Sequence, residues 1–136
     1  MKKAITIVLV EDDDGDAELF MEAINGSSLK NEIVRLVNGE EAVDYIENNS
    51  STGHVIFLDL NLPKIDGREV LKKIKEDADW KTCPVIVMTT SESHEDIIQC
   101  YEQSANIFIT KPVRFDEFVR IIKTMKNVWL ELVVVP

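Results

Sequence analysis

Side chains that could do chemistry follow four of the five apolar runs in the sequence. Glu11 and Asp12 follow the first run, and Asp59 directly follows the third. Thr89 comes at the end of the fourth run, and Lys111 comes just after the fifth. Burying a carboxylate costs free energy unless a partner compensates its charge. Acids at the mouth of an apolar core therefore indicate a functional site.

This combination of side chains suits phosphoryl transfer to a carboxylate. Carboxylate oxygens of Glu11, Asp12 and Asp59 suit a hard divalent cation, and Mg²⁺ that keeps several waters is the expected ion. With the cation offsetting the repulsion among the acids, Asp59 could attack phosphorus and form an aspartyl phosphate. Lys111 and the hydroxyl group of Thr89 would then contact the phosphoryl oxygens.

The five apolar runs predict five β-strands with helices between them. The predicted strands cover residues 5–10, 32–37, 55–58, 85–88 and 107–109. All but the second are continuous rather than alternating, which is typical of strands covered on both faces. Apolar residues at helical spacing predict helices around 17–24, 39–47, 68–75, 95–103 and 115–125. Five β-then-α units predict an α/β fold, (βα)5, with a parallel sheet and helices on both faces. In such sheets the functional crevice lies outside the carboxyl ends of the strands, where these polar side chains meet.

Length and composition favour one soluble domain. The chain has 136 residues, enough for one good core, and it has no apolar run long enough to cross a membrane. Its net charge of −10 argues against a nucleic-acid surface. Cys83 and Cys100 have no metal-ligand spacing, so we expect reduced thiols in a cytoplasmic protein. Residues 1–127 are predicted to form the domain, followed by an apolar tail, 128–136.

Four short motifs carry a resemblance to a known family. The strings "VLVEDD", "FLDLNLPKIDG", "MTTS" and "TKP" occur in this order and in the expected strand context. Together they resemble the receiver domain of response regulators in two-component signalling, of which the bacterial chemotaxis regulator is an example. The resemblance covers residues 5–127 and implies the flavodoxin-like strand order 2-1-3-4-5.

The resemblance also implies roles for individual residues. Asp59 would be the phosphoacceptor, and Glu11 and Asp12 would be the acidic pair that binds Mg²⁺. The backbone carbonyl of Asn61 would be a further metal ligand. Thr89 would be the switch hydroxyl group, and Lys111 would contact the phosphate. Two further implied features are a cis peptide bond to Pro112 and a switch aromatic, Phe108, which here lacks the hydroxyl group of a tyrosine.

A narrower resemblance concerns partners. The loop "DADWKTCP", the string "TTS" and the ending "WLEL" are similar to stand-alone regulators of cyanobacterial and bacterial phytochromes. This implies a sensor histidine kinase of phytochrome type as the phosphoryl donor, and a downstream protein that the sequence does not name. We expect a homodimer through the face formed by the fourth helix, the fifth strand and the fifth helix, with the apolar tail at the interface.

Other polar residues are expected to have no role in this site, and two other functions are alternatives to phosphoryl transfer in signalling. Asp13, Asp14 and Asp16 are expected to be solvated residues of a first helical turn, and His54 and His94 surface loop residues. A Mg²⁺-dependent phosphatase with an aspartyl intermediate is one alternative, although such enzymes resemble one another in a second acid at the position of Asn61. A receiver fold that binds partners without being phosphorylated is the other.

Overall fold

The computed structural model describes residues 5–26, 31–90, 94–103, 105, 107–112 and 114–125. These residues form a parallel five-stranded sheet in the order β2-β1-β3-β4-β5. The strands are β1 (Thr6–Val10), β2 (Ile33–Leu36), β3 (His54–Leu58), β4 (Val85–Thr89) and β5 (Ile107–Thr110). The helices are α1 (Asp14–Gly26), α2 (Gly39–Asn48), α3 (Gly67–Glu76), the 3₁₀ turn η1 (Trp80–Thr82), α4 (His94–Glu102) and α5 (Phe115–Met125). The predicted (βα)5 flavodoxin-like α/β fold and its strand order 2-1-3-4-5 are confirmed.

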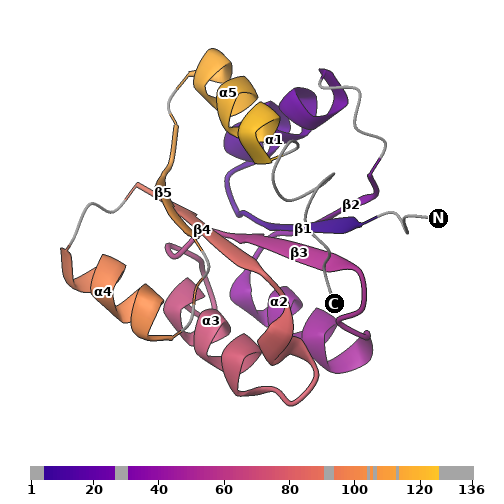
Figure 1. Cartoon of the computed structure of the whole chain (residues 1–136), viewed down its shortest axis with the longest axis vertical. Helices are drawn as coiled ribbons and strands as arrows, with labels where there is room; N and C mark the ends of the chain where they lie inside the picture. The colour runs from indigo at the N-terminus through magenta and orange to yellow at the C-terminus, as the bar shows by residue number, and fades with distance from the viewer. Residues whose placement is uncertain are drawn as a thin grey trace.

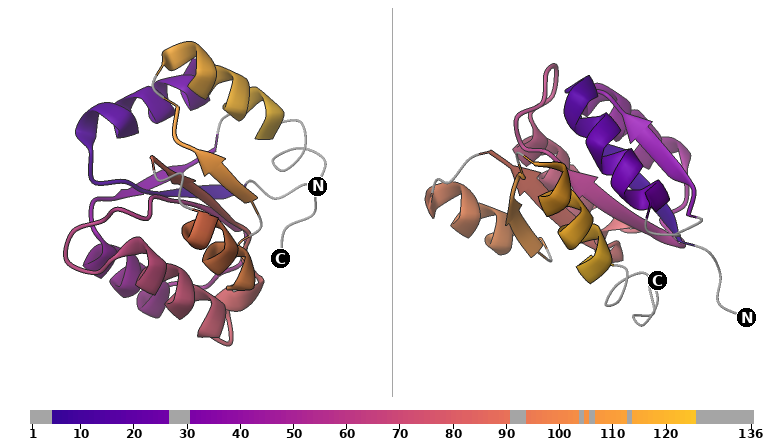
Figure 2. Two further views of the ribbon diagram at one scale, coloured as in Figure 1. Left: turned by 90° about the vertical axis from the view of Figure 1, so that its left-hand side faces the viewer. Right: turned by 90° about the horizontal axis from the view of Figure 1, so that it is seen from above.

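Helices cover both faces of the sheet. α1 and α5 lie side by side on one face, and α2, α3 and α4 lie on the other (Figures 1 and 2). Alternate residues of each strand enter the two cores: Ile7 and Leu9 pack with α1 and α5, whereas Val8 and Val10 pack with α2 and α3. Burying one such side chain contributes about 2 kcal/mol. Strands buried on both faces explain why the runs in the sequence are continuous.

Side-chain caps set where two of the helices begin. The side chain of Asn38 accepts a hydrogen bond from the Glu41 N–H at 2.8 Å, at the start of α2. The side chain of Asp66 accepts one from the Arg68 N–H at 2.9 Å, at the start of α3. These caps satisfy N–H groups that have no partner within the helix. The residue pair Asn25-Gly26 is typical of a helix stop, and α1 ends at Gly26.

Two glycines allow the loop between β3 and α3 to lie against its neighbours. The Gly67 N–H donates to the Leu60 carbonyl at 2.9 Å, and the Gly39 N–H donates to the Pro63 carbonyl at 3.3 Å. A Cβ atom on Gly67 would overlap the carbonyl oxygen of Asp59, and one on Gly39 would overlap backbone of the same loop. The absence of a side chain at both positions therefore fixes the path of the chain just after Asp59.

His54 differs from its prediction as a surface loop residue. It is the first residue of β3, and its Nε2 atom lies 2.8 Å from the hydroxyl oxygen of Tyr45. Its ring centroid lies 5.0 Å from that of Trp80, which is fully buried. The hydrogen bond and the ring contact compensate for partial burial of the imidazole.

The expected cis bond to Pro112 is also not found, because no described peptide bond is cis. The trans form is the more stable one for X–Pro bonds in general. Ser93, a residue type that favours the start of a helix, lies outside the described residues, as does the apolar tail 128–136.

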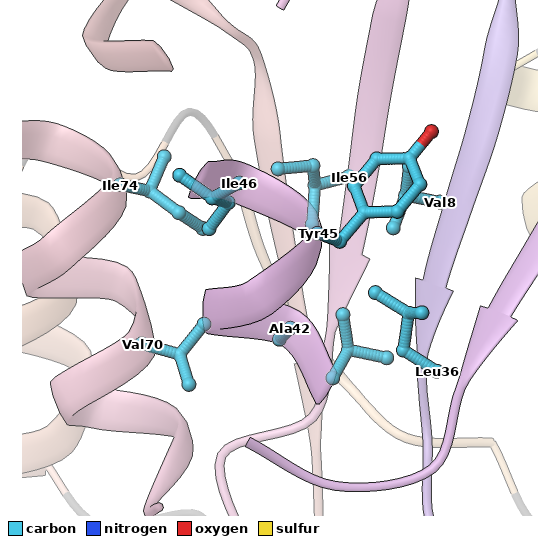
Figure 3. Close-up of a pocket in the computed structure, with 9 residues that line it drawn as sticks. Val8, Leu36, Ala42, Tyr45, Ile46, Ile56, Val70 and Ile74 are labelled. Carbon is cyan, nitrogen blue, oxygen red and sulfur yellow. The ribbon is translucent and has the colours of Figure 1, made fainter. Parts of the chain in front are cut away.

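A small apolar cavity lies between α2 and the sheet (Figure 3). It encloses about 10 Å³ and is lined by Val8, Val10, Leu36, Ala42, Tyr45, Ile46, Ile56, Val70 and Ile74. The hydroxyl oxygen of Tyr45 points away from this space toward His54. Because the lining offers no polar partner, we expect the cavity to be dry, a packing gap rather than a ligand site. None of the described helices is long and apolar enough to span a membrane.

Candidate functional site

The predicted site residues lie at one edge of the sheet, at the carboxyl ends of four strands. Glu11 follows β1, Asp59 follows β3, Thr89 ends β4 and Lys111 follows β5. Backbone hydrogen bonds continue the sheet here, since the Asp59 N–H donates to the Val10 carbonyl at 3.1 Å. The Lys111 N–H donates to the Thr89 carbonyl at 2.7 Å. The strand ends thus position the side chains, as expected for open parallel sheets.

Three carboxylates gather at the centre of this edge. Glu11, Asp12 and Asp59 each present an oxygen atom, and these atoms lie within 4.8 Å of one another. Glu11 and Asp59 are buried, at 2% and 6% exposure, whereas Asp12 is exposed. Hard carboxylate oxygens from two strands, with one side open to water, fit a divalent cation that retains part of its hydration shell.

Lys111 is the cation that contacts two of these acids, Glu11 and Asp59, together with Asp16. Its Nζ atom lies 2.5 Å from Glu11 Oε1, 2.8 Å from Asp16 Oδ2 and 3.0 Å from Asp59 Oδ2. Burial alone would lower the pKa of Lys111, but hydrogen bonds to the three carboxylates more than offset this and raise it. Lys111 is therefore held in its charged form.

Burial disfavours the charged form of Glu11, and here the neighbouring groups do not reverse its effect on the pKa. Removal from water raises the pKa of Glu11, and the nearby charge of Asp59 raises it further, against the opposing contact with Lys111. Two close carboxylates share one buried ammonium group, so an additional positive charge would favour the ionised form of Glu11.

Asn61 links the acidic cluster to Thr89. Its backbone N–H donates to Asp59 Oδ1 at 3.0 Å, and its side-chain Nδ2 lies 3.2 Å from Thr89 Oγ1. The side chain of Thr89 is fully buried. A role of the Asn61 carbonyl as a metal ligand stays a prediction.

Phe108 lies on β5, on the side of the sheet that faces α4. Its ring is partly buried and packs against the core formed with α2 and α3. Its backbone N–H donates to the hydroxyl oxygen of Tyr101 at 3.3 Å. Tyr101 of α4 therefore provides an acceptor for a backbone N–H group of the edge strand β5. The sequence pattern did not predict this contact.

Two residues near the site differ from their predictions or were missed. Asp16, predicted to be a solvated helix residue, contacts Lys111 because the first turn of α1 faces β5 across the site. Asp13 and Asp14 are exposed, as predicted. The sequence pattern predicts no role for Arg35, but its guanidinium group donates to the carbonyl oxygen of Glu11. A basic residue within an apolar strand is a weak signal, and only the fold places it beside this loop.

Comparison with known proteins defines the class of protein. The family model for the response regulator receiver domain matches residues 7–123. The chain therefore belongs to the response regulator receiver domain family of two-component signalling. Members of this class are phosphoacceptors that work with a histidine kinase, rather than turnover enzymes.

Individual relatives are similar over nearly the whole chain. Response regulator Rcp1 of Synechocystis sp. is 38% identical over 135 residues, which cover 96% of this chain and 92% of that protein. The crystal structure of the phosphorylated cyanobacterial phytochrome response regulator RcpA has a TM-score of 0.91 at 38% identity and covers 98% of this chain and 99% of its own. The Mn²⁺-bound form of Rcp1 has a TM-score of 0.87 at 36% identity, with coverage of 97% and 99%.

Proposed function

We propose that Asp59 accepts a phosphoryl group from the phosphohistidine of a sensor histidine kinase of phytochrome type, in a reaction that requires Mg²⁺. The observation that carries the proposal is the contact of Asp59 with Lys111 inside a cluster of three carboxylates. A purely structural core would gain nothing from this costly arrangement. Relatives described as phytochrome response regulators support the type of kinase.

The proposed chemistry is a single displacement at phosphorus. An oxygen of the Asp59 carboxylate attacks phosphorus, an O–P bond forms, and the P–N bond to the donor histidine breaks with its electron pair returning to the imidazole. Glu11, Asp12, Asp59 and the Asn61 carbonyl would bind Mg²⁺, which when bound neutralises the charge on the transferring oxygens. Lys111, which contacts Asp59 at 3.0 Å, would contact the phosphoryl oxygens and compensate their negative charge.

Phosphorylation then shifts an equilibrium between two conformations. The hydroxyl group of Thr89 moves to the phosphoryl group and leaves the amide of Asn61, which lies 3.2 Å away from it in this structure. The space vacated beside β4 lets Phe108 reorient, and the face formed by α4, β5 and α5 changes shape. The same residues assist removal of the phosphoryl group by water.

That face is also the proposed surface for a second copy of the chain and for a downstream protein. Ile98 and Tyr101 of α4 and Phe115 of α5 are exposed at 44%, 50% and 45%. We propose a cytoplasmic homodimer in which residues 1–127 form the domain and residues 128–136 contribute to the interface. Apolar side chains exposed on neighbouring elements favour such a contact.

The test of the proposed function is intact-mass spectrometry after incubation with acetyl phosphate. We expect a gain of one phosphoryl group that depends on Mg²⁺, is abolished by EDTA and is lost in Asp59→Asn. Asp44→Asn, an exposed carboxylate on α2, is the matched control and should be labelled like the wild type. Stoichiometric labelling of Asp59→Asn would contradict the assignment.

The two alternatives predict different results in phosphate-release and labelling assays. A phosphatase would release inorganic phosphate from an external phosphoester with repeated turnover. A binding module would remain unlabelled both with acetyl phosphate and with a phosphorylated phytochrome-type kinase.

A further inference from the structure

Arg35 makes an unusual set of contacts for a residue of an edge strand. Its guanidinium group donates to the carbonyl oxygen of Glu11 from Nε at 3.2 Å and from Nη2 at 3.1 Å. Nη2 also lies 3.4 Å from the carbonyl oxygen of Asp12 and 2.8 Å from a carboxylate oxygen of Asp14. One side chain thus contacts three of the four residues that follow β1.

The register of the sheet explains why Arg35 reaches this loop. Arg35 is paired with Leu9 of the neighbouring strand β1, two residues before Glu11. Residues of β2 alternate between the two faces, and Ile33 packs against the core beneath α1. Arg35 therefore lies on the same face as Ile33, and its long side chain extends along it to the loop that precedes α1.

The bonds to the carbonyl oxygens matter more than the ion pair. The carboxylate of Asp14 is 91% exposed, so its attraction to Arg35 is weakened by solvent. The side chain of Arg35 is only 22% exposed, and its bonds to the carbonyl oxygens are charge-assisted. A planar guanidinium group can satisfy neighbouring carbonyls in one fixed geometry, which an ammonium group cannot do.

We infer that Arg35 is a positioning residue for the metal-binding carboxylates, holding the backbone of Glu11 and Asp12 so that their side chains face Asp59. This role rests on the proposed function, because it concerns the cation of the same site. Glu11 and Asp12 are carried on the peptide units whose carbonyls Arg35 binds. Groups that orient metal ligands in this way affect affinity for the ion although they do not touch it.

The charge of Arg35 and its hydrogen bonds are expected to change the affinity for Mg²⁺ in opposite directions. A positive charge beside a cation site weakens cation binding, whereas a well-oriented acidic pair strengthens it. Replacement of Arg35 therefore shows which effect dominates: the affinity for Mg²⁺ rises if charge repulsion dominates and falls if orientation of the acidic pair dominates. If charge alone mattered, Arg35→Gln would bind Mg²⁺ more tightly and Arg35→Lys would be unchanged.

The experiment is a calorimetric titration of the full chain with Mg²⁺, combined with thermal unfolding in EDTA. We expect Arg35→Gln to bind Mg²⁺ about tenfold more weakly than the wild type, the low end of the range for groups that orient metal ligands. The affinity of Arg35→Lys for Mg²⁺ should lie between those of Arg35→Gln and the wild type. Arg120→Gln removes one exposed guanidinium group from α5 and should bind Mg²⁺ like the wild type.

Thermal unfolding distinguishes positioning from general stabilisation. A merely structural role would lower the unfolding temperature in EDTA and leave the affinity of the folded variant for Mg²⁺ unchanged, and that result would overturn the inference. Equal or tighter binding by Arg35→Gln would also overturn it. If Arg35→Gln does not fold, weaker binding by Arg35→Lys supports the role and unchanged binding overturns it. A wild-type chain that binds no Mg²⁺ would overturn the proposed function itself, and this role with it.

Discussion

At the scale of single residues, the site is a balance of charge around one ammonium group. Lys111 is 8% exposed and contacts three carboxylates, two of them buried. In the absence of a metal ion, the single positive charge of Lys111 compensates only part of the negative charge that these carboxylates place there. A bound divalent cation would share that task, so Lys111 and the cation are partly interchangeable in their effect on stability.

The first prediction concerns loss of this ammonium group. Lys111→Met leaves Glu11 and Asp59 buried without their cation, and we expect a loss of about 2–3 kcal/mol in unfolding free energy in EDTA. Mg²⁺ should restore more stability to this variant than to the wild type. Urea unfolding with and without Mg²⁺ measures both effects. Lys72→Met, on the exposed side of α3, is the control; equal stability of the two variants in EDTA would contradict the prediction.

The second prediction concerns Cys83, which is buried between η1 and β4. Burial raises the pKa of Cys83 from an ordinary value of 9.0 to about 12. Above pH 9 the unfolded chain releases this proton while the folded chain keeps it, so stability falls as the pH rises toward 12. One pH unit above 9, the loss is about 1 kcal/mol. Cys83→Val should flatten this dependence between pH 8 and 10 in urea unfolding; an unchanged slope would contradict it.

At the scale of elements, the loop between β3 and α3 is the part of the fold on which the site depends most. Gly67 lies so close to the carbonyl of Asp59 that even one additional carbon atom would overlap it. The side chain of Arg68, next in sequence, binds Asp96 of α4 through two hydrogen bonds at 2.8 and 2.6 Å. The start of α3 therefore connects the residues after Asp59 with the start of α4.

The third prediction follows from this close approach. Gly67→Ala must displace the backbone of Asp59 or Leu60, and we expect a loss of about 1–3 kcal/mol in unfolding free energy. Labelling by acetyl phosphate should also become slower, because Asp59 moves relative to Lys111. Gly26→Ala is the control, since a Cβ atom there has no neighbour within 4 Å. Wild-type stability and labelling of Gly67→Ala would show that the loop can shift freely.

The order of the elements could be predicted because it depends on local patterns. Continuous apolar runs and helical spacing gave the five units, and strand ends such as Asp59 and Lys111 located the site. Contacts between distant segments could not be predicted in this way. Asp16 reaches the site only because α1 packs beside α5, on the side of the sheet where it meets Lys111. Arg35 reaches it only because β2 pairs with β1. His54 was misassigned because its partner Tyr45 lies on another element.

At the scale of the whole molecule, the sheet separates two cores that are covered by different helices. One core is covered by α1 and α5, and the other by α2, α3 and α4 (Figure 2). The proposed interface includes α4, β5 and α5 and so crosses the edge of the sheet at which the two cores meet. A change at β5 can therefore reach both layers of helices.

The fourth prediction concerns the assembly. Removal of residues 128–136, or Trp129→Ala in the full chain, should convert the proposed dimer to a monomer in sedimentation velocity. The shortened chain should keep its cooperative unfolding, because the two described cores lie within residues 1–127. An unchanged sedimentation coefficient for both variants would exclude the tail from the interface, and a shortened chain that fails to fold would contradict the domain boundary.

The distance along the chain between Asp59 and Lys111 has a consequence for synthesis. The two residues are separated by 52 positions, and Lys111 follows the last strand of the sheet. During translation the earlier strands leave the ribosome first, so the acids exist for a time without their ammonium partner. Every acid of the site is thus synthesised before Lys111. The phosphoacceptor and the ammonium group of the site are therefore present together only after β5 has been synthesised.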